Sequence, residues 1–154
     1  MAFEFLSPDR LTDGVVDLVI ESREPADPEK GHAPMYRYRI ELHGSGDPVG
    51  QLRFRVGHTP LLEMAGHLGY QVEEAHRGHG YAERACRLVR SVALAHGFDR
   101  LRITLEPSNA ASRRTVEKLG AEYRDTVELP ADHPMFREDR QRLRRYDWTI
   151  RSSR

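Results

Sequence analysis

The sequence predicts a mixed α/β layer fold, in which helices pack against a sheet. Two observations support this prediction. Segments that alternate apolar and polar residues, as half-buried strands do, occur in both halves of the chain, and the second half also contains two helical patterns that each end at a glycine. The expected order is several antiparallel strands, followed by strand, helix, strand, helix and strand.

The first half of the chain carries the expected antiparallel strands. Residues 14–22, GVVDLVIES, form the first of them. Residues 35–43 alternate like a half-buried strand, and the turn GSGD joins them to residues 48–56, so these two segments are expected to pair as a hairpin. Residues 24–34 contain three prolines and alternating charge, which predicts a mobile connection. A further strand is expected at residues 66–72, GHLGYQV.

The clearest helical pattern in the chain covers residues 80–97. Ala85, Leu88, Val89 and Val92 recur at the spacing of one helix face, while charged residues fall elsewhere. The glycine at the end of the segment is typical of a helix C-terminus.

A strand, a second helix and two final strands are expected after this helix. Residues 100–106, RLRITLE, alternate like a strand with one buried face, and residues 108–120, SNAASRRTVEKLG, begin with a capping residue and end at a glycine. The last two strands are residues 122–129 and 144–150, with a polar insertion at residues 130–141 between them.

Composition indicates a soluble globular protein. The 154 residues suit a single domain over 1–154, with 38% hydrophobic and 31% charged residues. Lysine plus arginine and aspartate plus glutamate number 24 each, so no basic excess points to nucleic acid as a partner. The single cysteine, Cys86, excludes an internal disulfide.

The same composition bears on the expected compartment. No apolar run approaches the roughly 20 residues that a membrane span needs. The first residues, MAFEFLSPDR, lack the basic start and the apolar stretch of a signal peptide. We therefore expect a cytoplasmic protein that does not bind a membrane.

A short glycine-rich segment at residues 76–82, HRGHGYA, precedes the first helix. One interpretation is a structural turn that uses glycine only for its backbone freedom. A dinucleotide-binding loop is less well supported, because the G-x-G-x-x-G spacing is absent, and a P-loop lacks its lysine. An anion held on backbone N–H groups at the helix start is a further interpretation.

At this point the sequence resembles the GNAT acyltransferases, which bind acetyl-coenzyme A. The run Arg77-Gly78-His79-Gly80-Tyr81-Ala82 is similar to their R/Q-x-x-G-x-G/A signature, and PSNAASRRTVEKLGAEY resembles their second hallmark, an N-x-x-S/A helix. The resemblance covers residues 49–123 best. It is strongest to the branch that contains the ribosomal-protein alanine acetyltransferases. It implies the GNAT fold, with a mostly antiparallel central sheet, splayed middle strands and flanking helices.

The resemblance also implies how acetyl-coenzyme A would bind. Backbone N–H groups of the signature run would hold the pyrophosphate, with the first arginine of the run adding charge. The pantetheine arm would lie between the splayed strands, near Gln71 and Val72. Asn109 is either a pantetheine contact or a simple helix cap. Arg113 and Arg114 are candidates for the 3′-phosphate, with a plain surface role as the alternative, and Ser112 also belongs to this expected cofactor site.

The chemistry expected from the resemblance is direct attack of an amine on the thioester in a ternary complex. A backbone N–H near Val72 would polarise the carbonyl. His67 and Glu63 are the candidate general bases, and for His67 a structural role is the competing interpretation. Relatives often use a tyrosine to protonate the thiolate, but Val116 stands at that place here, so Ser112 is the candidate.

The expected function is transfer of an acetyl group from acetyl-coenzyme A to a primary amine. The acceptor is a small molecule or a peptide, and no metal is expected, because the histidines show no ligand spacing. The alternative is a sensor or interaction module that binds acetyl-coenzyme A without turnover. A homodimer formed through the final strand is compatible with the sequence.

Overall fold

The fold is built on one eight-stranded sheet with the strand order β1-β2-β3-β4-β5-β6-β8-β7. The computed structural model describes residues 3–133 and 135–151. All neighbouring strands pair antiparallel except β5 and β6, which are parallel. The strands are β1 (Arg10–Thr12), β2 (Val16–Glu24), β3 (Met35–Leu42), β4 (Pro48–Arg55), β5 (Leu68–Val72), β6 (Arg100–Leu105), β7 (Glu122–Glu128) and β8 (Arg142–Thr149).

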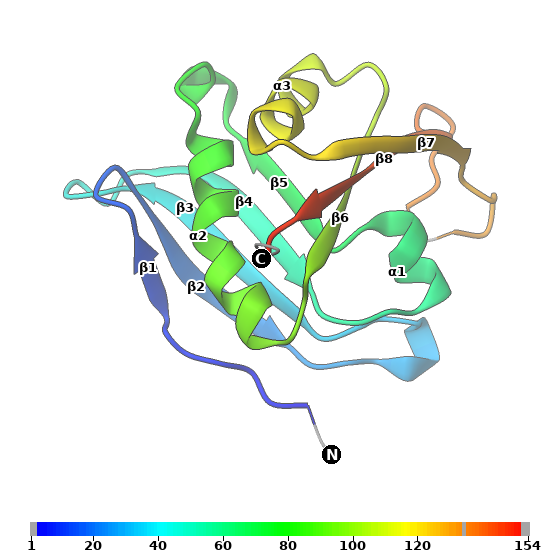
Figure 1. The fold of residues 1–154 in the computed structure, drawn as a ribbon, viewed down its shortest axis with the longest axis horizontal. Coiled ribbons are helices and arrows are strands. Elements are labelled where there is room, and N and C mark those ends of the chain that lie inside the picture. Colours follow the sequence, from blue (N-terminus) through cyan, green and yellow to red (C-terminus); the bar gives the residue numbers. More distant parts are fainter. Residues whose placement is uncertain (1–2, 134, 152–154) are drawn as a thin grey trace.

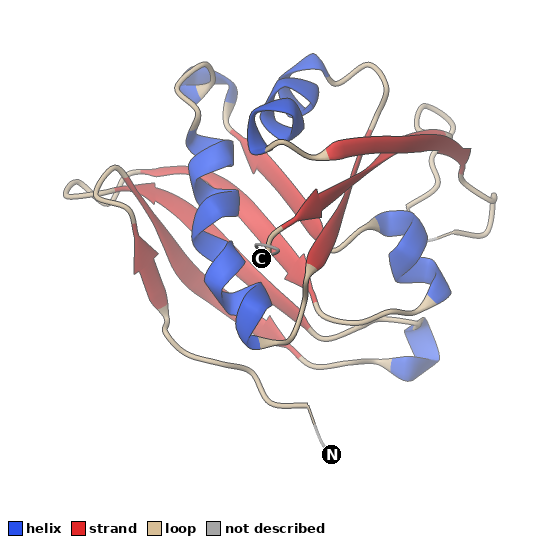
Figure 2. Cartoon of the chain, viewed as in Figure 1, coloured by secondary structure: helices blue, strands red, loops and turns tan. Residues whose placement is uncertain are grey.

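Helices lie on both sides of this sheet. The long helix α2 (Tyr81–Ala95) crosses one face in front of the central strands, and α3 (Ala110–Leu119) lies beside it (Figure 1). The short helix α1 (Pro60–Ala65) packs against β6 (Figure 2). Two 3₁₀ turns, Pro28–Lys30 and Glu74–His76, complete the helical segments.

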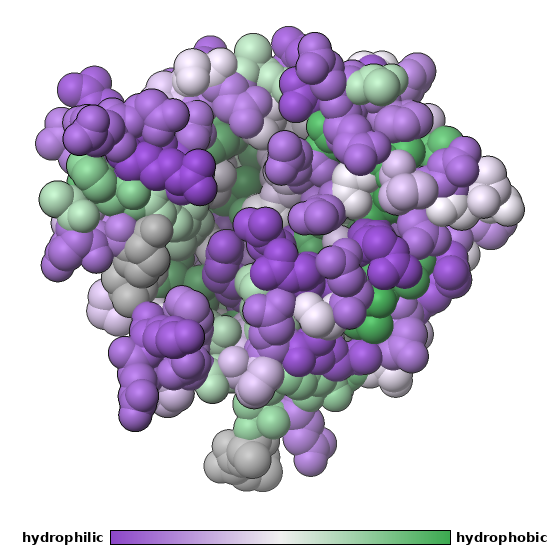
Figure 3. Space-filling model, turned by 180° about the vertical axis from the view of Figure 1, so that it is seen from behind, coloured by the Kyte–Doolittle hydropathy of each residue, from purple (hydrophilic) through white to green (hydrophobic). Residues whose placement is uncertain are grey.

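The hydrophobic core lies between α2 and the sheet. Alternation along β3 and β4 places Tyr36, Tyr38 and Phe54 in this core, where they are fully buried. The residues between them, among them Arg37 and Arg53, therefore project from the opposite face. That face is mostly hydrophilic, with hydrophobic residues visible between the polar side chains (Figure 3).

The splay of the middle strands is visible in the pairing of β5 with β6. Their only register pair is Leu68 with Ile103. Beyond this point β5 continues to pair with β4 as far as Val72, so its other edge is left without a strand partner within the described residues. The mixed α/β fold with splayed middle strands is thus confirmed.

Three elements differ from the expectation. Strand β1 was not predicted, because three residues are too few to show alternation. Helix α1 was also missed, although Thr59 caps it by accepting a hydrogen bond from Leu62 N at 3.2 Å and Pro60 occupies its first turn. The connection at residues 24–34 contains a 3₁₀ turn and a bridge between Asp27 and His32, which its prolines and alternating charge did not predict.

Candidate functional site

The loop between β5 and α2 has the backbone geometry of an anion-binding turn. Gly78 and Gly80 adopt φ angles of +89° and +75°, which side chains other than glycine rarely tolerate. Gly80 is the N-cap of α2 and supplies no side-chain acceptor to the first-turn N–H groups. These N–H groups, at the positive end of the helix dipole, are therefore available to an anionic ligand.

A cavity of about 400 Å³, here called the loop cavity, opens between this loop and α3. Its charged residues are mostly basic, with Glu83 as the acidic exception. It is lined by Tyr70, Gln71, Val72, His76, Arg77, Gly78, Gly80, Tyr81, Ala82, Glu83, Asn109, Ala111, Ser112, Arg114, Thr115 and Lys118. The positive lining and the N-terminus of α2 together suit a phosphate-bearing ligand.

A second cavity, the gap cavity, lies where β5 and β6 separate and has a volume of about 170 Å³. It shares four lining residues with the loop cavity, namely Tyr70, Gln71, Asn109 and Ser112. The two cavities therefore adjoin, and the free edge of β5 forms part of the wall of both. A chain-like ligand anchored at the loop has a path between the splayed strands.

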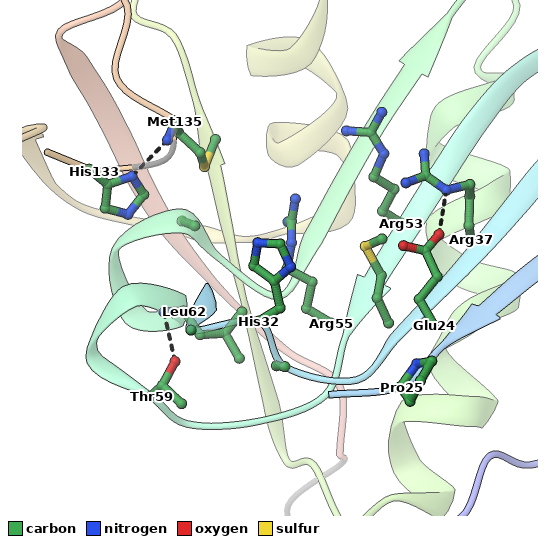
Figure 4. Close-up of a pocket in the computed structure, with 14 residues that line it drawn as sticks. Glu24, Pro25, His32, Arg37, Arg53, Arg55, Thr59, Leu62, His133 and Met135 are labelled. Carbon is green, nitrogen blue, oxygen red and sulfur yellow. Dashed lines mark hydrogen bonds and ion pairs between the residues drawn. The ribbon is translucent and has the colours of Figure 1, made fainter. Parts of the chain in front are cut away.

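A third cavity of about 280 Å³, here called the arginine cavity, adjoins the other end of the gap cavity. These two share Arg53, Arg55, Ala65 and Met135. Figure 4 shows its lining side chains, which come from β3, β4, α1 and the segments around residues 24–34 and 130–141. Neighbouring cavities in this series share lining residues, so the three together are here called the groove, and both irregular segments border its far end.

Asn109 and Ser112 are held in the middle of this groove by the start of α3. The Asn109 side chain caps the helix and accepts a hydrogen bond from Ser112 N at 3.0 Å. Tyr70 donates its hydroxyl hydrogen to the Ser112 carbonyl at 3.3 Å. Val116 is fully buried in the core and has no group to donate. Ser112 lines both the loop and the gap cavities.

Tyr70 is a groove residue that the sequence reasoning missed. Burial is the main cause that raises the pKa of its hydroxyl, so the group remains neutral. Its place in the alternating strand at residues 66–72 indicated only that it faces the interior. Cys86, buried in α2, has its thiol pKa raised by burial to about 12, which excludes a nucleophilic thiolate there.

His67 lies away from the groove, and its ring is fully occupied. Its Nε2 donates to the Gly57 carbonyl at 3.1 Å, and its Nδ1 accepts from Arg102 N at 2.9 Å. The side chain is buried, and desolvation is the largest cause that lowers its pKa. This arrangement favours the structural interpretation of His67, because both nitrogens are engaged and the ring ties β6 to the segment before α1; its role as a general base stays a prediction.

Glu63, the second candidate base, belongs to α1, where its carboxylate accepts a hydrogen bond from Arg102 at 2.9 Å. With His58 and His67 it lines a cavity separate from the groove. One potential ligand atom from each of these three residues lies within 4.8 Å of the others. Both His67 nitrogens and a Glu63 oxygen already serve hydrogen bonds in the protein, so this donor set does not fit a metal ion.

Two residues expected at the cofactor site lie outside the loop cavity. His79 lines a neighbouring surface pocket on the other side of the loop. Arg113 donates to the Pro107 carbonyl instead of facing the cavity. Arg114 and Lys118 line the cavity from α3 and supply the positive charge expected from Arg113. The other expected residues of the loop, β5 and α3 all meet at the groove.

Comparison with known proteins places the chain in a family. The model of the acetyltransferase (GNAT) domain matches residues 3–122. The chain therefore belongs to the GNAT acetyltransferase family, as its signature run and splayed strands indicate. No curated protein matches the chain significantly.

Solved structures of GNAT proteins share the fold. Mycobacterium smegmatis RimJ in complex with CoA-disulfide is 24% identical, with a TM-score of 0.57 over 75% of this chain and 53% of RimJ. The ribosomal-protein-S5-alanine acetyltransferase from Vibrio fischeri is 15% identical, with a TM-score of 0.61 over 78% of this chain and 64% of that one. RimL, a ribosomal L7/L12 α-N-protein acetyltransferase, is 16% identical, with a TM-score of 0.65 over 90% of this chain and 96% of RimL.

The match to RimJ thus covers about half of that protein's length, and a match to an acetyltransferase from Bacillus anthracis covers 66% of its chain.

Among the described residues, no helix is long and apolar enough to cross a membrane.

Proposed function

We propose that this chain is a single acetyltransferase domain that transfers an acetyl group from acetyl-coenzyme A to a primary amine. The observation that supports the proposal best is the groove, in which neighbouring cavities share lining residues. It joins an anion-binding loop to a separate cavity through the gap between β5 and β6. A phosphate-bearing donor and an amine acceptor can therefore enter from opposite ends and meet between the strands.

The loop end of the groove fits the phosphates of acetyl-coenzyme A. Backbone N–H groups at the start of α2 would hold the pyrophosphate, and the basic residues Arg77, Arg114 and Lys118 line the same cavity. The backbone of Gln71 and Val72, on the free edge of β5, would hydrogen-bond the pantetheine arm. Acetyl-coenzyme A would supply the activated thioester, and every other group used comes from the chain.

The reaction forms a C–N bond between the amine and the acetyl carbon and breaks the C–S bond. The proton lost by the nitrogen is balanced by the proton gained by the sulfur. Ser112, which lines both the loop and the gap cavities, would donate a hydrogen bond to the departing sulfur. The backbone N–H of Val72 is proposed to polarise the carbonyl.

Ribosomal-protein N-termini are candidate acceptors, because RimL and the Vibrio fischeri protein are named as enzymes for such substrates. Small amines remain candidates as well. A cavity of about 280 Å³ is near the lower end of ligand pockets and accommodates the amine-bearing head of either kind of acceptor.

The test is release of free coenzyme A thiol from acetyl-coenzyme A, measured across amino acids, polyamines and peptides with free N-termini. We expect amine-dependent release, with the N-acetylated product detected by mass spectrometry. Saturable binding of acetyl-coenzyme A without consumption across the whole panel would instead support a sensor. The fully bonded ring of His67, which leaves no assigned base, is the observation that favours that second function.

A further inference from the structure

The arginine cavity carries more positive charge than its neighbours neutralise. Three guanidinium groups line it, from Arg37, Arg53 and Arg55, and Glu24 is the carboxylate among its lining residues. Glu24 is bonded to Arg37 at 2.9 Å, and this hydrogen bond is the first cause that lowers the Glu24 pKa. The carboxylate is therefore ionised and pairs with Arg37; the charge of Arg53 also lowers the Glu24 pKa, but among the described residues neither Arg53 nor Arg55 forms an ion pair.

The strand register brings like charges together in this cavity. Arg37 on β3 and Arg53 on β4 are direct cross-strand partners. Like charges at opposed positions destabilise a sheet. Nε of Arg53 is buried and has no hydrogen-bond partner among the described residues. A buried, unpaired donor on a charged group is costly, so a ligand that accepts this hydrogen bond would be bound favourably.

Arg55, two residues further along β4, also lacks a strong hydrogen-bond partner among the described residues. Its hydrogen bond within the described residues runs from Nη1 to the Gly66 carbonyl at 3.5 Å, which is at the limit of a useful interaction. Burial is the main cause that lowers its pKa, and Arg53 and Arg37 lower it further. Because arginine keeps its charge in proteins, this guanidinium also needs an anion.

We propose that the acetyl acceptor is an amine that carries an oxyanion, a carboxylate or a phosphate, and that Arg53 and Arg55 bind this oxyanion. The planar guanidinium group suits two-point binding of both kinds of anion. Arg53 and Arg55 line both the gap cavity and the arginine cavity, so the anion would be held beside the point that the thioester reaches. This inference rests on the proposed acetyltransferase function and specifies its substrate class.

The phosphates of the coenzyme do not account for these arginines. The loop cavity has its own basic residues, Arg77, Arg114 and Lys118, at the opposite end of the groove. The gap cavity separates the two basic ends, and Arg53 and Arg55 do not line the loop cavity.

The test uses matched pairs of acceptors that differ only in the anion. Glycine against glycinamide tests a free α-carboxylate, and an Ala-Asp peptide amide against the Ala-Asn peptide amide tests an acidic protein N-terminus. O-phosphoethanolamine against ethanolamine tests a phosphate. We expect kcat/KM to be about 10- to 100-fold higher for the anionic member of at least one pair, the range expected for a charged hydrogen bond. The pair that shows it identifies the source of the anion.

Arg53→Met and Arg55→Met should remove this preference mainly by raising KM for the anionic acceptor. Arg39→Met is the matched control, because Arg39 lies on the same face of β3 as Arg37 but pairs with Glu41 and does not line the cavity. Arg53→Met should not lower the melting temperature, since it removes both the Arg37 repulsion and the unpaired buried Nε. Equal kcat/KM for both members of every pair would overturn the inference.

A binding measurement separates this inference from the proposed function. Succinate and inorganic phosphate, which carry no amine, are added to the protein with coenzyme A, and thermal unfolding is followed. Stabilisation of the wild type and Arg39→Met, lost in Arg53→Met, would support the anion site even if no amine is acetylated. Acetylation of neutral amines without any stabilisation by either anion would overturn the anion site and leave the acetyltransferase standing. Absence of both turnover and stabilisation would overturn both.

Discussion

Gly50 on β4 lies so close to Gln71 on β5 that a Cβ atom at position 50 would collide with the Gln71 backbone oxygen. The same atom would stand 3.1 Å from the Cα of Val72, the cross-strand partner of Gly50. Glycine at this position therefore sets how closely β4 approaches the end of β5. That end of β5 lines both the loop and the gap cavities.

Gly50→Ala is expected to lower the free energy of unfolding by about 1–3 kcal/mol, because backbone atoms must shift to accommodate the methyl group. It should also weaken acetyl-coenzyme A binding, since Gln71 moves with β5. Gly69→Ala is the control: its Cβ would meet nothing closer than Arg55 Nη1 at 3.9 Å. Urea unfolding of both variants checks the prediction, and equal destabilisation would show that the close approach is not what matters.

Gly80→Glu is expected to abolish binding of acetyl-coenzyme A by placing a carboxylate and a side chain at the loop. Ligand at a hundred times its dissociation constant stabilises a protein by roughly 2.7 kcal/mol, which thermal unfolding detects easily. Gly46→Glu is a close control, because Gly46 has the same φ of +75°, also has nothing within 4 Å of its Cβ position, and lies in the β3–β4 turn. Both variants should lose similar stability without ligand, but only Gly46→Glu should keep the ligand shift. If Gly80→Glu kept it too, the coenzyme would bind elsewhere.

Ser112→Ala is expected to lower kcat by about 100-fold or more, the lower range for a lost proton donor, while acetyl-coenzyme A affinity stays near that of the wild type. The reason is that Ser112 Oγ would contact the sulfur mainly as charge develops on it. Ser91→Ala, on the exposed side of α2, is the control and should leave kcat unchanged. An unchanged kcat in Ser112→Ala would mean that the sulfur gains its proton from another group.

His67 should make the stability of the protein depend on pH below about 6.5. Burial lowers its pKa in the folded state below the ordinary value of 6.5, so the unfolded chain binds more protons in this range. Stability from the neutral ring is complete above pH 6.5 and is lost as the pH falls toward the folded pKa, by at most about 1.4 kcal/mol per pH unit. His96, whose pKa burial also lowers, contributes in the same direction.

His67→Gln is therefore expected to be less stable than the wild type at pH 7.5 but to show a flatter profile down to pH 5. Denaturant unfolding at several pH values measures both slopes. The residual slope in the variant comes from His96. Asp17 and Asp147 do not interfere, because their pKa values are lowered and they lose their contribution only at more acidic pH. Parallel profiles would show that the His67 ring is not held neutral.

Several features of this protein were predictable from local sequence. Alternation marked β3, β6 and β8, and the glycines before α2 marked the loop proposed to bind an anion, because a positive φ and a missing Cβ are requirements of single positions. The helix pattern around Val89 and the cap at Asn109 are also local, since spacing and capping act within a few residues. The resemblance to the GNAT family was recognised from the glycine-rich run before α2 and from the segment that forms α3.

The sequence by itself thus determined most of the elements and the glycine-rich loop before α2, whereas the tertiary structure decided which side chains meet. The separation of β5 from β6 places Ser112 in the groove and leaves His67 outside it, bonded to Arg102. Register alone sets Arg37 against Arg53, a pairing that alternation within either strand does not reveal. Alternation fixes only the face on which a residue lies, and contacts between strands depend on register and splay, which arise from packing between distant segments.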